Sequence, residues 1–204
     1  MQPWIDFEKQ KLEKIFTEKK DILDIGGGLR LDRQKNNRFD PARQWLNRYL
    51  PSVNYRILDK VADYQPDIVG DIHHLPLADQ TYGAVICIAL LEHVEDPAQA
   101  LREIYRVLKP GGYVYAYLPF LYYYHPMKGY YNDYFRFTED GVRHLFRHFS
   151  QLELANVRGA FETINNLYPG KFSKLTGPLA VLADHLFRKV RSKQTSGYNV
   201  FAVK

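Results

Sequence analysis

The chain has 204 residues and a mass of 23.9 kDa, a length typical of one folded domain. Its 46% hydrophobic and 25% charged residues exclude a disordered, collagen-like or coiled-coil chain. A single cysteine, Cys87, excludes an internal disulfide, so we expect a reducing, cytoplasmic setting. The first residues lack the pattern of a signal peptide and no apolar run is long enough to span a membrane, so we expect neither export nor a transmembrane helix.

The net charge of +5 raises the question of nucleic acid or an anionic membrane as a partner. The excess is local, because residues 171–204 contain seven basic residues and one acid, Asp184, and therefore contribute +6. We expect a basic amphipathic helix within residues 171–193 that packs on the sheet and keeps a solvated basic rim. Weak contact of this helix with an anionic membrane surface is the alternative.

Strand-like and helical patterns alternate along the chain. The continuous apolar run over residues 82–90 is typical of a strand buried on both faces of a parallel sheet. The alternation of strands and helices predicts an α/β sheet with crossover connections in a single domain over residues 1–204. In chain order we expect a helix over 1–19, a strand over 21–25, a polar loop over 30–40, a helix over 41–50, strands over 54–58, 67–71 and 82–90, a helix over 97–108, a strand over 113–118, a helix over 138–149, a strand over 152–157, a helix over 173–190 and a strand over 198–203.

A glycine triplet, Gly26, Gly27 and Gly28, directly follows the first predicted strand. Glycine has no side chain to keep a ligand away from the backbone, so this position favours a binding loop, although a turn without a ligand fits the triplet equally well. The third glycine of a dinucleotide-binding fingerprint is missing. The loop therefore favours a smaller group without a pyrophosphate.

Acidic residues end the next two predicted strands. Asp59 lies where open α/β sheets place an acid that accepts hydrogen bonds from both ribose hydroxyls; alternatively it caps a turn or pairs with Lys60. Asp71 is followed by the apolar Ile72 and Leu75, a combination suited to a flat base with an exocyclic amine. Together these residues suggest a nucleoside ligand.

Five motifs follow one another between residues 21 and 118. They are Asp24-Ile25-Gly26-Gly27-Gly28, Asp59, Gly70-Asp71-Ile72 with Leu75-Pro76-Leu77, Leu91-Glu92-His93-Val94-Glu95-Asp96-Pro97, and Arg106-Val107-Leu108-Lys109-Pro110-Gly111-Gly112. In this order they resemble the motifs of class I S-adenosylmethionine-dependent methyltransferases of the type 11 subgroup. The resemblance implies S-adenosylmethionine as the cofactor. It also implies a three-layer Rossmann-like fold, in which a seven-stranded sheet carries helices on both faces and the last strand is antiparallel and inserted beside its neighbour.

The same resemblance implies roles for single residues. The segment between Gly28 and Asp59 is longer than is usual in the family. The cofactor site implied by the resemblance comprises Asp24, Gly26, Gly27 and Gly28 at the methionine portion, Asp59 at the ribose, Asp71 and Ile72 at the adenine, and Leu90 beside the methyl group, with Glu92 and His93 beyond it.

Ten of the sixteen tyrosines lie between Tyr105 and Tyr134, many of them in an irregular segment over residues 119–137 that we call the lid. A narrower subset of these enzymes, whose members often act in glycan or natural-product pathways, has a segment that this one resembles at Pro119-Phe120-Leu121-Tyr122, His125, Asp133-Tyr134 and Arg136-Phe137-Thr138. The aromatic rings of the lid predict a pocket for a sugar or an aromatic acceptor; the alternative is a lid whose rings cover one another. The tyrosines predicted to line the pocket are Tyr122, Tyr123, Tyr124, Tyr130 and Tyr131.

Methyl transfer needs precise positioning and often a base for the proton of the acceptor. His125 is the predicted base, because imidazole titrates near neutrality and the lid follows the fifth strand beside the cofactor. Asp133 and Tyr134 are the alternatives. The predicted acceptor contacts are His93, Tyr122, Tyr130 and Arg136, of which Arg136 alternatively anchors the lid.

We therefore expect a methyltransferase that acts on a small molecule, such as a sugar or a glycan or natural-product intermediate. A nucleic-acid methyltransferase is one alternative, disfavoured by the lack of an Asn- or Asp-Pro-Pro-aromatic motif after the fourth strand. A binding module that keeps the fold without catalysis is the other. We expect no metal site at His73-His74 and Glu92-His93, because neighbouring histidines in extended chain point in different directions. The oligomeric state is left open.

Overall fold

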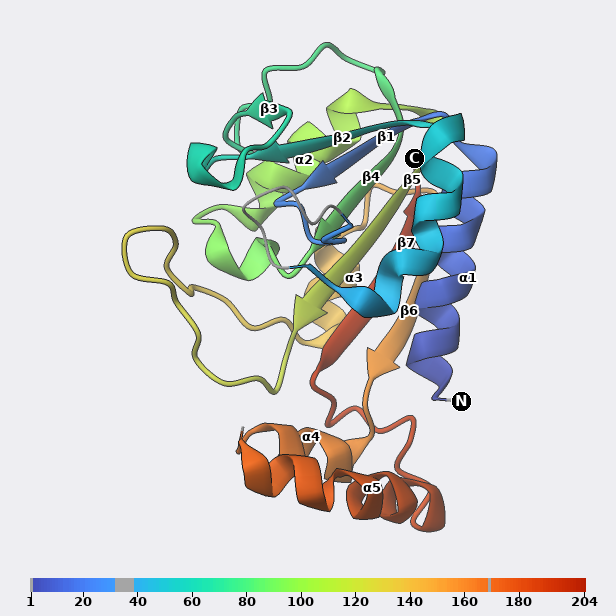
Figure 1. Cartoon of the computed structure of the whole chain (residues 1–204), viewed down its shortest axis with the longest axis vertical. Coiled ribbons are helices and arrows are strands. Elements are labelled where there is room, and N and C mark those ends of the chain that lie inside the picture. The colour runs from blue at the N-terminus through green and yellow to red at the C-terminus, as the bar shows by residue number, and fades with distance from the viewer. Residues whose placement is uncertain (1, 32–38, 169) are drawn as a thin grey trace.

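The structure, a computed structural model, describes residues 2–31, 39–168 and 170–204. Its centre is a seven-stranded sheet in the order β3-β2-β1-β4-β5-β7-β6 (Figure 1). Strands β1 to β5 pair in parallel, whereas β7 is antiparallel to both β5 and β6. This confirms the predicted fold class and the inserted last strand. The strands are β1 (Asp21–Ile25), β2 (Asn54–Asp59), β3 (Ile68–Val69), β4 (Tyr82–Ile88), β5 (Leu108–Pro119), β6 (Gln151–Val157) and β7 (Gly197–Val203).

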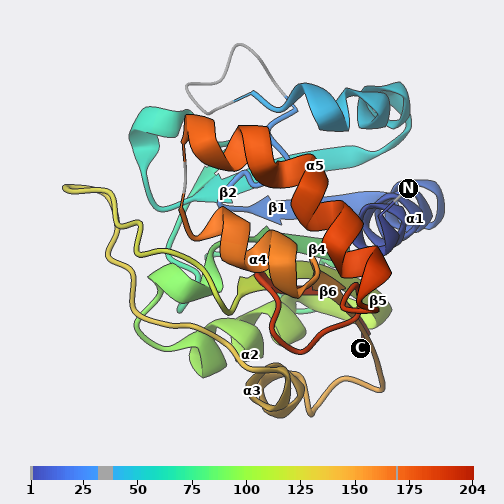
Figure 2. The same cartoon turned by 90° about the horizontal axis from the view of Figure 1, so that it is seen from below.

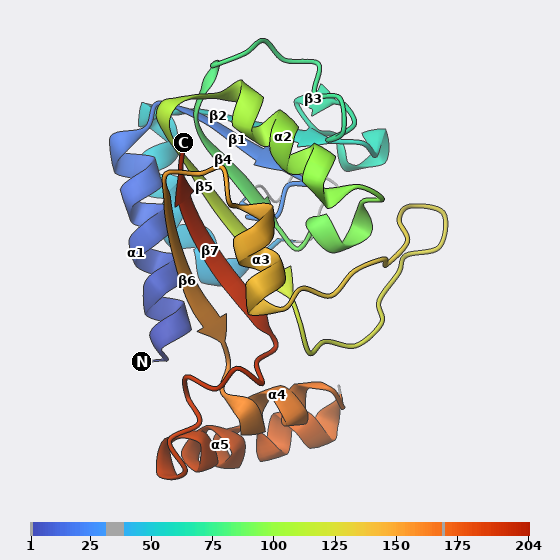
Figure 3. The same ribbon diagram turned by 180° about the vertical axis from the view of Figure 1, so that it is seen from behind.

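Helices cover both faces of the sheet and complete three layers. The helices α1 (Pro3–Glu18) and η1 (Pro41–Ser52) lie on one face, and α2 (Pro97–Val107) and α3 (Glu139–Leu145) lie on the other (Figures 1 and 3). Each face has its own apolar core, and β4 contributes to both because all its residues before Ile88 are buried. The remaining helical elements are η2 (Ala62–Tyr64), η3 (Leu91–His93), α4 (Ala160–Asn166) and α5 (Lys171–Leu186).

Several elements differ from the predicted bounds, for local reasons. Strand β4 ends at Ile88 rather than Leu90, because Ala89 adopts a left-handed conformation with φ 50°. Strand β5 already begins at Leu108, because the chain after α2 enters the sheet beside Tyr82 with a bulge instead of a separate turn. The helix predicted over 138–149 ends at Leu145, with Thr138 as its N-cap. Most of the loop predicted over 30–40 lies outside the described residues.

The pair of helices α4 and α5 lies apart from the sheet, beyond the ends of β6 and β7 (Figure 1), and Figure 2 shows the two side by side. The prediction that the basic helix packs on the sheet is therefore wrong, and α4 was not predicted. The amphipathic pattern is real, but its apolar stripe faces outward: four leucines of α5 are between 63% and 77% exposed. These are Leu175, Leu179, Leu182 and Leu186. No helix in the described part of the chain has the length and hydropathy needed to cross a bilayer.

One buried carboxylate joins α5 to α4. Asp184 is 1% exposed and accepts hydrogen bonds from the backbone N–H groups of Phe161 and Glu162, both at 3.0 Å. These donors belong to the first turn of α4, where helices leave N–H groups without an internal partner. Gly159, which precedes α4, leaves room for this carboxylate, since a Cβ there would lie 2.3 Å from Asp184 Cγ.

We expect Asp184→Ala to destabilise α4 by about 1–2 kcal/mol, because the first turn of that helix loses its cap. Hydrogen exchange should show faster exchange of the α4 amides while the amides of β4 are unchanged. Asp184→Asn keeps one acceptor oxygen and should give an intermediate effect. Unchanged protection of α4 in Asp184→Ala would contradict this role.

Candidate functional site

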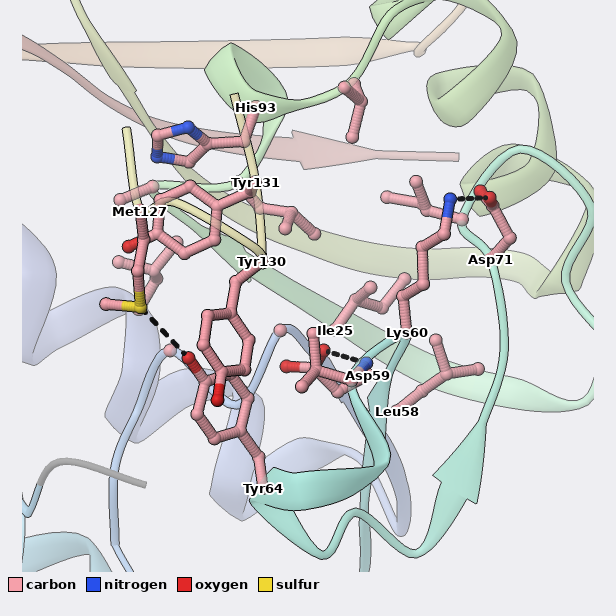
Figure 4. A pocket seen from close by; sticks show the side chains of 18 of the residues that line it. Ile25, Leu58, Asp59, Lys60, Tyr64, Asp71, His93, Met127, Tyr130 and Tyr131 are labelled. Atoms are coloured by element: carbon pink, nitrogen blue, oxygen red, sulfur yellow. Dashed lines mark hydrogen bonds and ion pairs between the residues drawn. The ribbon is translucent and has the colours of Figure 1, made fainter. Parts of the chain in front are cut away.

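A cavity of about 700 Å³ opens at the carboxyl ends of the parallel strands. Figure 4 shows side chains from β1, β2 and the turn after β3 on one side of it, and side chains of the lid on the other. Such a crevice beyond the strand ends is where open α/β sheets bind their ligands. The lining residues are Ile25, Gly26, Gly28, Arg30, Leu58, Asp59, Lys60, Val61, Tyr64, Gly70, Asp71, Ile72, His73, Ile88, Ala89, Leu90, His93, Val94, Glu95, Met127, Tyr130, Tyr131, Asn132 and Tyr134.

The glycine loop after β1 requires glycine on steric grounds. Gly26 has φ 79°, a conformation that strains residues with a side chain. A Cβ on Gly28 would lie 2.7 Å from Cβ of Ile88 on the neighbouring strand. The loop thus packs closely against β4 and presents backbone to the cavity, as predicted for a binding loop.

Asp24 acts beneath this loop and not in the cavity. The buried carboxylate accepts hydrogen bonds from the backbone N–H groups of Gly28 and Leu29, each at 3.0 Å, and from the Tyr55 hydroxyl at 2.5 Å. Burial raises the pKa of Asp24 to about 6, although these donors oppose the rise. Neither Asp24 nor Gly27 is among the residues that line the cavity, and the hydrogen bonds of Asp24 hold the loop in shape from beneath.

The two acids at the ends of β2 and β3 line the cavity in different environments. Asp59 is partly buried, and its Oδ1 accepts a hydrogen bond from the Val61 N–H at 2.8 Å. Burial raises the pKa of Asp59. Lys60 pairs with Asp71 at 2.8 Å and not with Asp59, so this part of the alternative interpretation of Asp59 is excluded. Burial also acts to raise the pKa of Asp71, but hydrogen bonds from Lys60 and His73 outweigh it and hold that pKa well below its usual range.

The turn after β4 brings an apolar side chain onto the glycine loop. Ala89 is left-handed, and the Leu90 side chain lies against Gly26, with Leu90 Cδ1 3.3 Å from the position of a Cβ there. A left-handed residue other than glycine is uncommon and often marks a functional site. No pattern in the sequence indicated this conformation, although Leu90 was predicted to lie here.

The tip of the lid covers the cavity from the opposite side. The ring of Tyr130 stacks on Tyr64 of η2, with centroids 5.7 Å apart, and the Tyr64 hydroxyl lies 3.4 Å from Met127 Sδ (Figure 4). Tyr131 packs against His93 with ring centroids 4.3 Å apart. The predicted acceptor contacts Tyr130 and His93 therefore line the cavity.

An ion pair inside the lid accounts for two other predicted site residues. Arg136 donates to both oxygens of Asp133, at 2.5 and 2.7 Å, and to the backbone oxygens of Tyr122 and Tyr123. These guanidinium hydrogen bonds lower the pKa of Asp133 to about 2. Neither residue lines the cavity. The geometry supports the anchoring role weighed for Arg136 and not an acceptor contact, and it does not favour Asp133 as a base.

The remaining lid residues divide between the cavity and the surface. Tyr122 stacks on Tyr123, with centroids 4.4 Å apart, and neither lines the cavity, whereas Tyr124 is 75% exposed. Of the five tyrosines predicted to line the acceptor pocket, Tyr130 and Tyr131 line this cavity. Of the three predicted bases, only Tyr134 lines the cavity, where it donates a hydrogen bond to Glu95 at 3.1 Å.

His125 lies behind the cavity lining in a polar cluster that the sequence did not indicate. Glu92 is completely buried, and neither of its carboxylate oxygens has a hydrogen-bond partner among the described residues. Burial raises the pKa of Glu92 to about 8. The Nε2 atoms of His93 and His125 lie 3.8 and 3.9 Å from Glu92 Oε1. The sequence motif placed Glu92 and His93 near the site, but only the folded lid brings His125 to them.

Comparisons with known proteins agree with this architecture. Residues 47–116 match the family model described as "Methyltransferase domain". A tRNA U34 carboxymethyltransferase of Nautilia profundicola is 27% identical to this chain over a match that covers 54% of this chain and 39% of the relative. A demethylmenaquinone methyltransferase of Chlamydia trachomatis is 45% identical over a match that covers 32% of this chain and 31% of that relative. This chain thus spans well under half the length of these relatives. A crystal structure of an S-adenosylmethionine-dependent methyltransferase from Archaeoglobus fulgidus shares the fold, with a TM-score of 0.61 and 12% identity over all of this chain and 95% of that one.

The Asp24–Tyr55 hydrogen bond should contribute to the free energy of unfolding in a way that depends on pH. The folded-state pKa of Asp24, about 6, lies above its ordinary value of 3.8, so its ionisation costs stability as pH rises through this window. Tyr55→Phe removes a donor to the ionised carboxylate. We expect this variant to lose about 1–3 kcal/mol of unfolding free energy above about pH 7 and distinctly less near pH 4.

Urea denaturation at both pH values measures this difference. Tyr82→Phe is the control, because the Tyr82 side chain is buried and its hydroxyl makes no hydrogen bond to any described residue. An equal loss at both pH values would show that the Tyr55 hydroxyl does not act through the Asp24 carboxylate.

Proposed function

We propose that this chain, a member of the class I S-adenosylmethionine-dependent methyltransferases, transfers the methyl group of that cofactor to a small-molecule acceptor. The observation that carries the proposal is that one cavity joins the glycine loop and the strand-end acids to an aromatic lid. One part of this cavity fits the cofactor, and the part under the lid fits a second, flat molecule.

The cofactor part has groups suited to each portion of S-adenosylmethionine. The glycine loop presents backbone at Gly26 and Gly28, where a side chain would clash or be strained. Asp59 has one oxygen held by the backbone, which fixes the carboxylate for hydrogen bonds from ribose hydroxyls. Ile72 and Asp71 provide an apolar surface and an acceptor for the adenine. These residues are the proposed cofactor contacts, with Leu90 beside the methyl group.

S-adenosylmethionine supplies a methyl group on a positively charged sulfur. The residues of the chain position the acceptor and exclude water: Tyr130 and Tyr131 cover the cavity, and the Tyr64–Tyr130 stack closes it toward η2. Tyr134 is proposed to take the proton of the acceptor while its own hydroxyl proton passes to the Glu95 carboxylate, because it lines the cavity and donates a hydrogen bond to that carboxylate.

The acceptor is proposed to be a flat or ring-shaped small molecule. Tyrosine faces suit sugar rings and aromatic rings, and one relative is named for demethylmenaquinone. Another relative is named for tRNA, but the charge of this chain does not favour a nucleic acid. The acids Asp59, Asp71 and Glu95 outnumber the cations Arg30 and Lys60 in the cavity lining. Lys60 is paired with Asp71, and the basic excess of the chain belongs to residues 171–204. A nucleic acid needs a basic track for its phosphates at the site.

Helix α5 is proposed to dock on an anionic membrane surface. Its outward leucine stripe continues into Phe187, which is 59% exposed, and Arg188, Lys189 and Arg191 follow. The acid of this region, Asp184, is buried against α4, so it does not offset the surface charge. An exposed apolar stripe flanked by cations is the pattern of helices that lie in a lipid interface.

Calorimetric titration with S-adenosylmethionine tests the cofactor site. We expect Asp59→Ala to weaken binding by roughly 10- to 100-fold, because a charged acceptor of ribose hydroxyls is lost. Asp140→Ala removes one negative charge from an exposed site on α3 and should bind as the wild type does. If the wild-type chain fails to bind at millimolar concentration, the proposed function fails; binding without methyl transfer to any of a panel of phenols, quinols and sugars would indicate a binding module.

Sedimentation with phosphatidylserine vesicles at low salt tests the membrane contact. We expect the wild-type chain to sediment with them and not with pure phosphatidylcholine, and Leu179→Gln combined with Leu182→Gln to remove most of the binding. Val69→Gln is the control, since it removes an exposed apolar side chain elsewhere. Failure of the wild-type chain to sediment, or equal loss in the control, would refute the contact.

A further inference from the structure

Three metal-ligating side chains converge between η3 and the lid. Glu92 and His93 belong to η3, and His125 belongs to the lid. One ligand atom from each lies within 4.8 Å of the other two. The Glu92 carboxylate is completely buried and unpartnered among the described residues, and one of its oxygens lies 3.8 and 3.9 Å from the two Nε2 atoms. A buried carboxylate without a partner is rare and requires an explanation.

The hydrogen bonds on the far side of each ring fix the tautomers. Nδ1 of His93 lies 2.6 Å from the backbone oxygen of Asn132, and Nδ1 of His125 lies 3.0 Å from that of Tyr123. A carbonyl oxygen only accepts, so each Nδ1 carries the hydrogen and each Nε2 of a neutral ring presents a lone pair. Asp133 Oδ2 adds a carboxylate 3.3 Å from Nδ1 of His125. Carbonyl and carboxylate partners of this kind orient the histidine ligands of metal sites.

The two Nε2 lone pairs and the Glu92 carboxylate, all hydrogen-bond acceptors, therefore face one another at the centre of this cluster. A single proton on Glu92 could serve only one of the two imidazoles, and distances of 3.8 and 3.9 Å are too long for a hydrogen bond. One divalent cation would satisfy all three groups at once. A tetrahedral ion about 2.1 Å from each ligand sets the ligand atoms about 3.4 Å apart. The two Glu92–histidine pairs would then close by about half an ångström, and the two histidine nitrogens, which lie within 4.8 Å of each other, by at most about 1.4 Å.

We propose that Glu92, His93 and His125 form a binding site for a divalent first-row transition-metal ion. Two imidazoles and one carboxylate are a donor set typical of zinc and of related ions such as iron, cobalt and manganese. The sequence-based expectation of no metal arose because Glu92 and His93 were grouped with His73 and His74 instead of with His125. His73 forms a hydrogen bond with Asp71 and lies outside the cluster.

The site has a structural consequence that does not depend on methyl transfer. Because His125 belongs to the lid and the other two ligands to η3, a bound ion joins the lid to the core beside the cavity that His93 lines. A further role rests on the proposed function: an ion with an open position lowers the pKa of a hydroxyl group that coordinates it.

Metal titration of the untagged full-length chain tests the site. After removal of metal with a chelator, Zn²⁺ is titrated in competition with a chromophoric chelator, and Co²⁺ is added separately to record its visible d–d absorption. We expect one high-affinity ion per chain, and both Glu92→Gln and His125→Ala should weaken Zn²⁺ binding by more than about tenfold and remove the Co²⁺ spectrum. In the wild type, Zn²⁺ should also slow hydrogen exchange in the lid.

Controls separate this site from adventitious binding and from misfolding. His144→Ala removes an exposed histidine on α3 and should leave the affinity unchanged. Glu92→Gln keeps the shape of the side chain, and its thermal unfolding without metal shows whether the variant folds. Zn²⁺ binding that is as tight in folded Glu92→Gln as in the wild type, or that is lost in His144→Ala, would overturn the proposal, as would the absence of stoichiometric binding to the wild-type chain. None of these outcomes depends on S-adenosylmethionine, so they are distinguishable from failure of the proposed function.

Discussion

The position of β1 in the sheet is the constraint on which the site depends. Strand β1 pairs with β2 on one side and β4 on the other, and the connections that follow β1 and β4 cover opposite faces, through η1 and α2 respectively. The chain therefore leaves these neighbouring strands in opposite directions, and a crevice opens between the two departures. The close approach of Gly28 to Ile88 gives the crevice its floor, and the carboxylate of Asp24 holds the loop in that position.

The lid is irregular, yet its backbone is held at defined points. The N–H groups of Tyr134 and Phe135 both donate to the backbone oxygen of Glu92, at 2.8 and 3.2 Å. The guanidinium of Arg136 satisfies carbonyl oxygens that no strand or helix would pair. Glu92 and Arg136, neither of which lines the cavity, thus order the segment that covers it. Glu92 contributes through its backbone oxygen, and its side chain is buried beside the lid.

Much of the fold was predictable because its information is local. Strand β4 is a continuous apolar run, and Asp59 and Asp71 follow strands whose ends must meet at one edge, so their convergence followed from topology alone. The rest depends on contacts between distant residues. An amphipathic stripe on α5 does not reveal whether it faces a sheet or solvent. The role of Asp24 in holding the glycine loop depends on its hydrogen bond with Tyr55 of the neighbouring strand β2. The approach of His125 to Glu92 depends on the path of the lid.

The connection between β6 and β7 is a place where this fold can vary without a change in the sheet. These strands are adjacent and antiparallel, and Val157 at the end of β6 pairs with Gly197 at the start of β7, so a short hairpin turn would suffice to join them. The chain instead inserts α4 and α5 between two points one strand spacing apart, on the far side of β5 from β1. An insertion with neighbouring ends can be lengthened, replaced or deleted in evolution without moving the sheet. The surface that this protein presents to its surroundings is thereby free to change independently of the site.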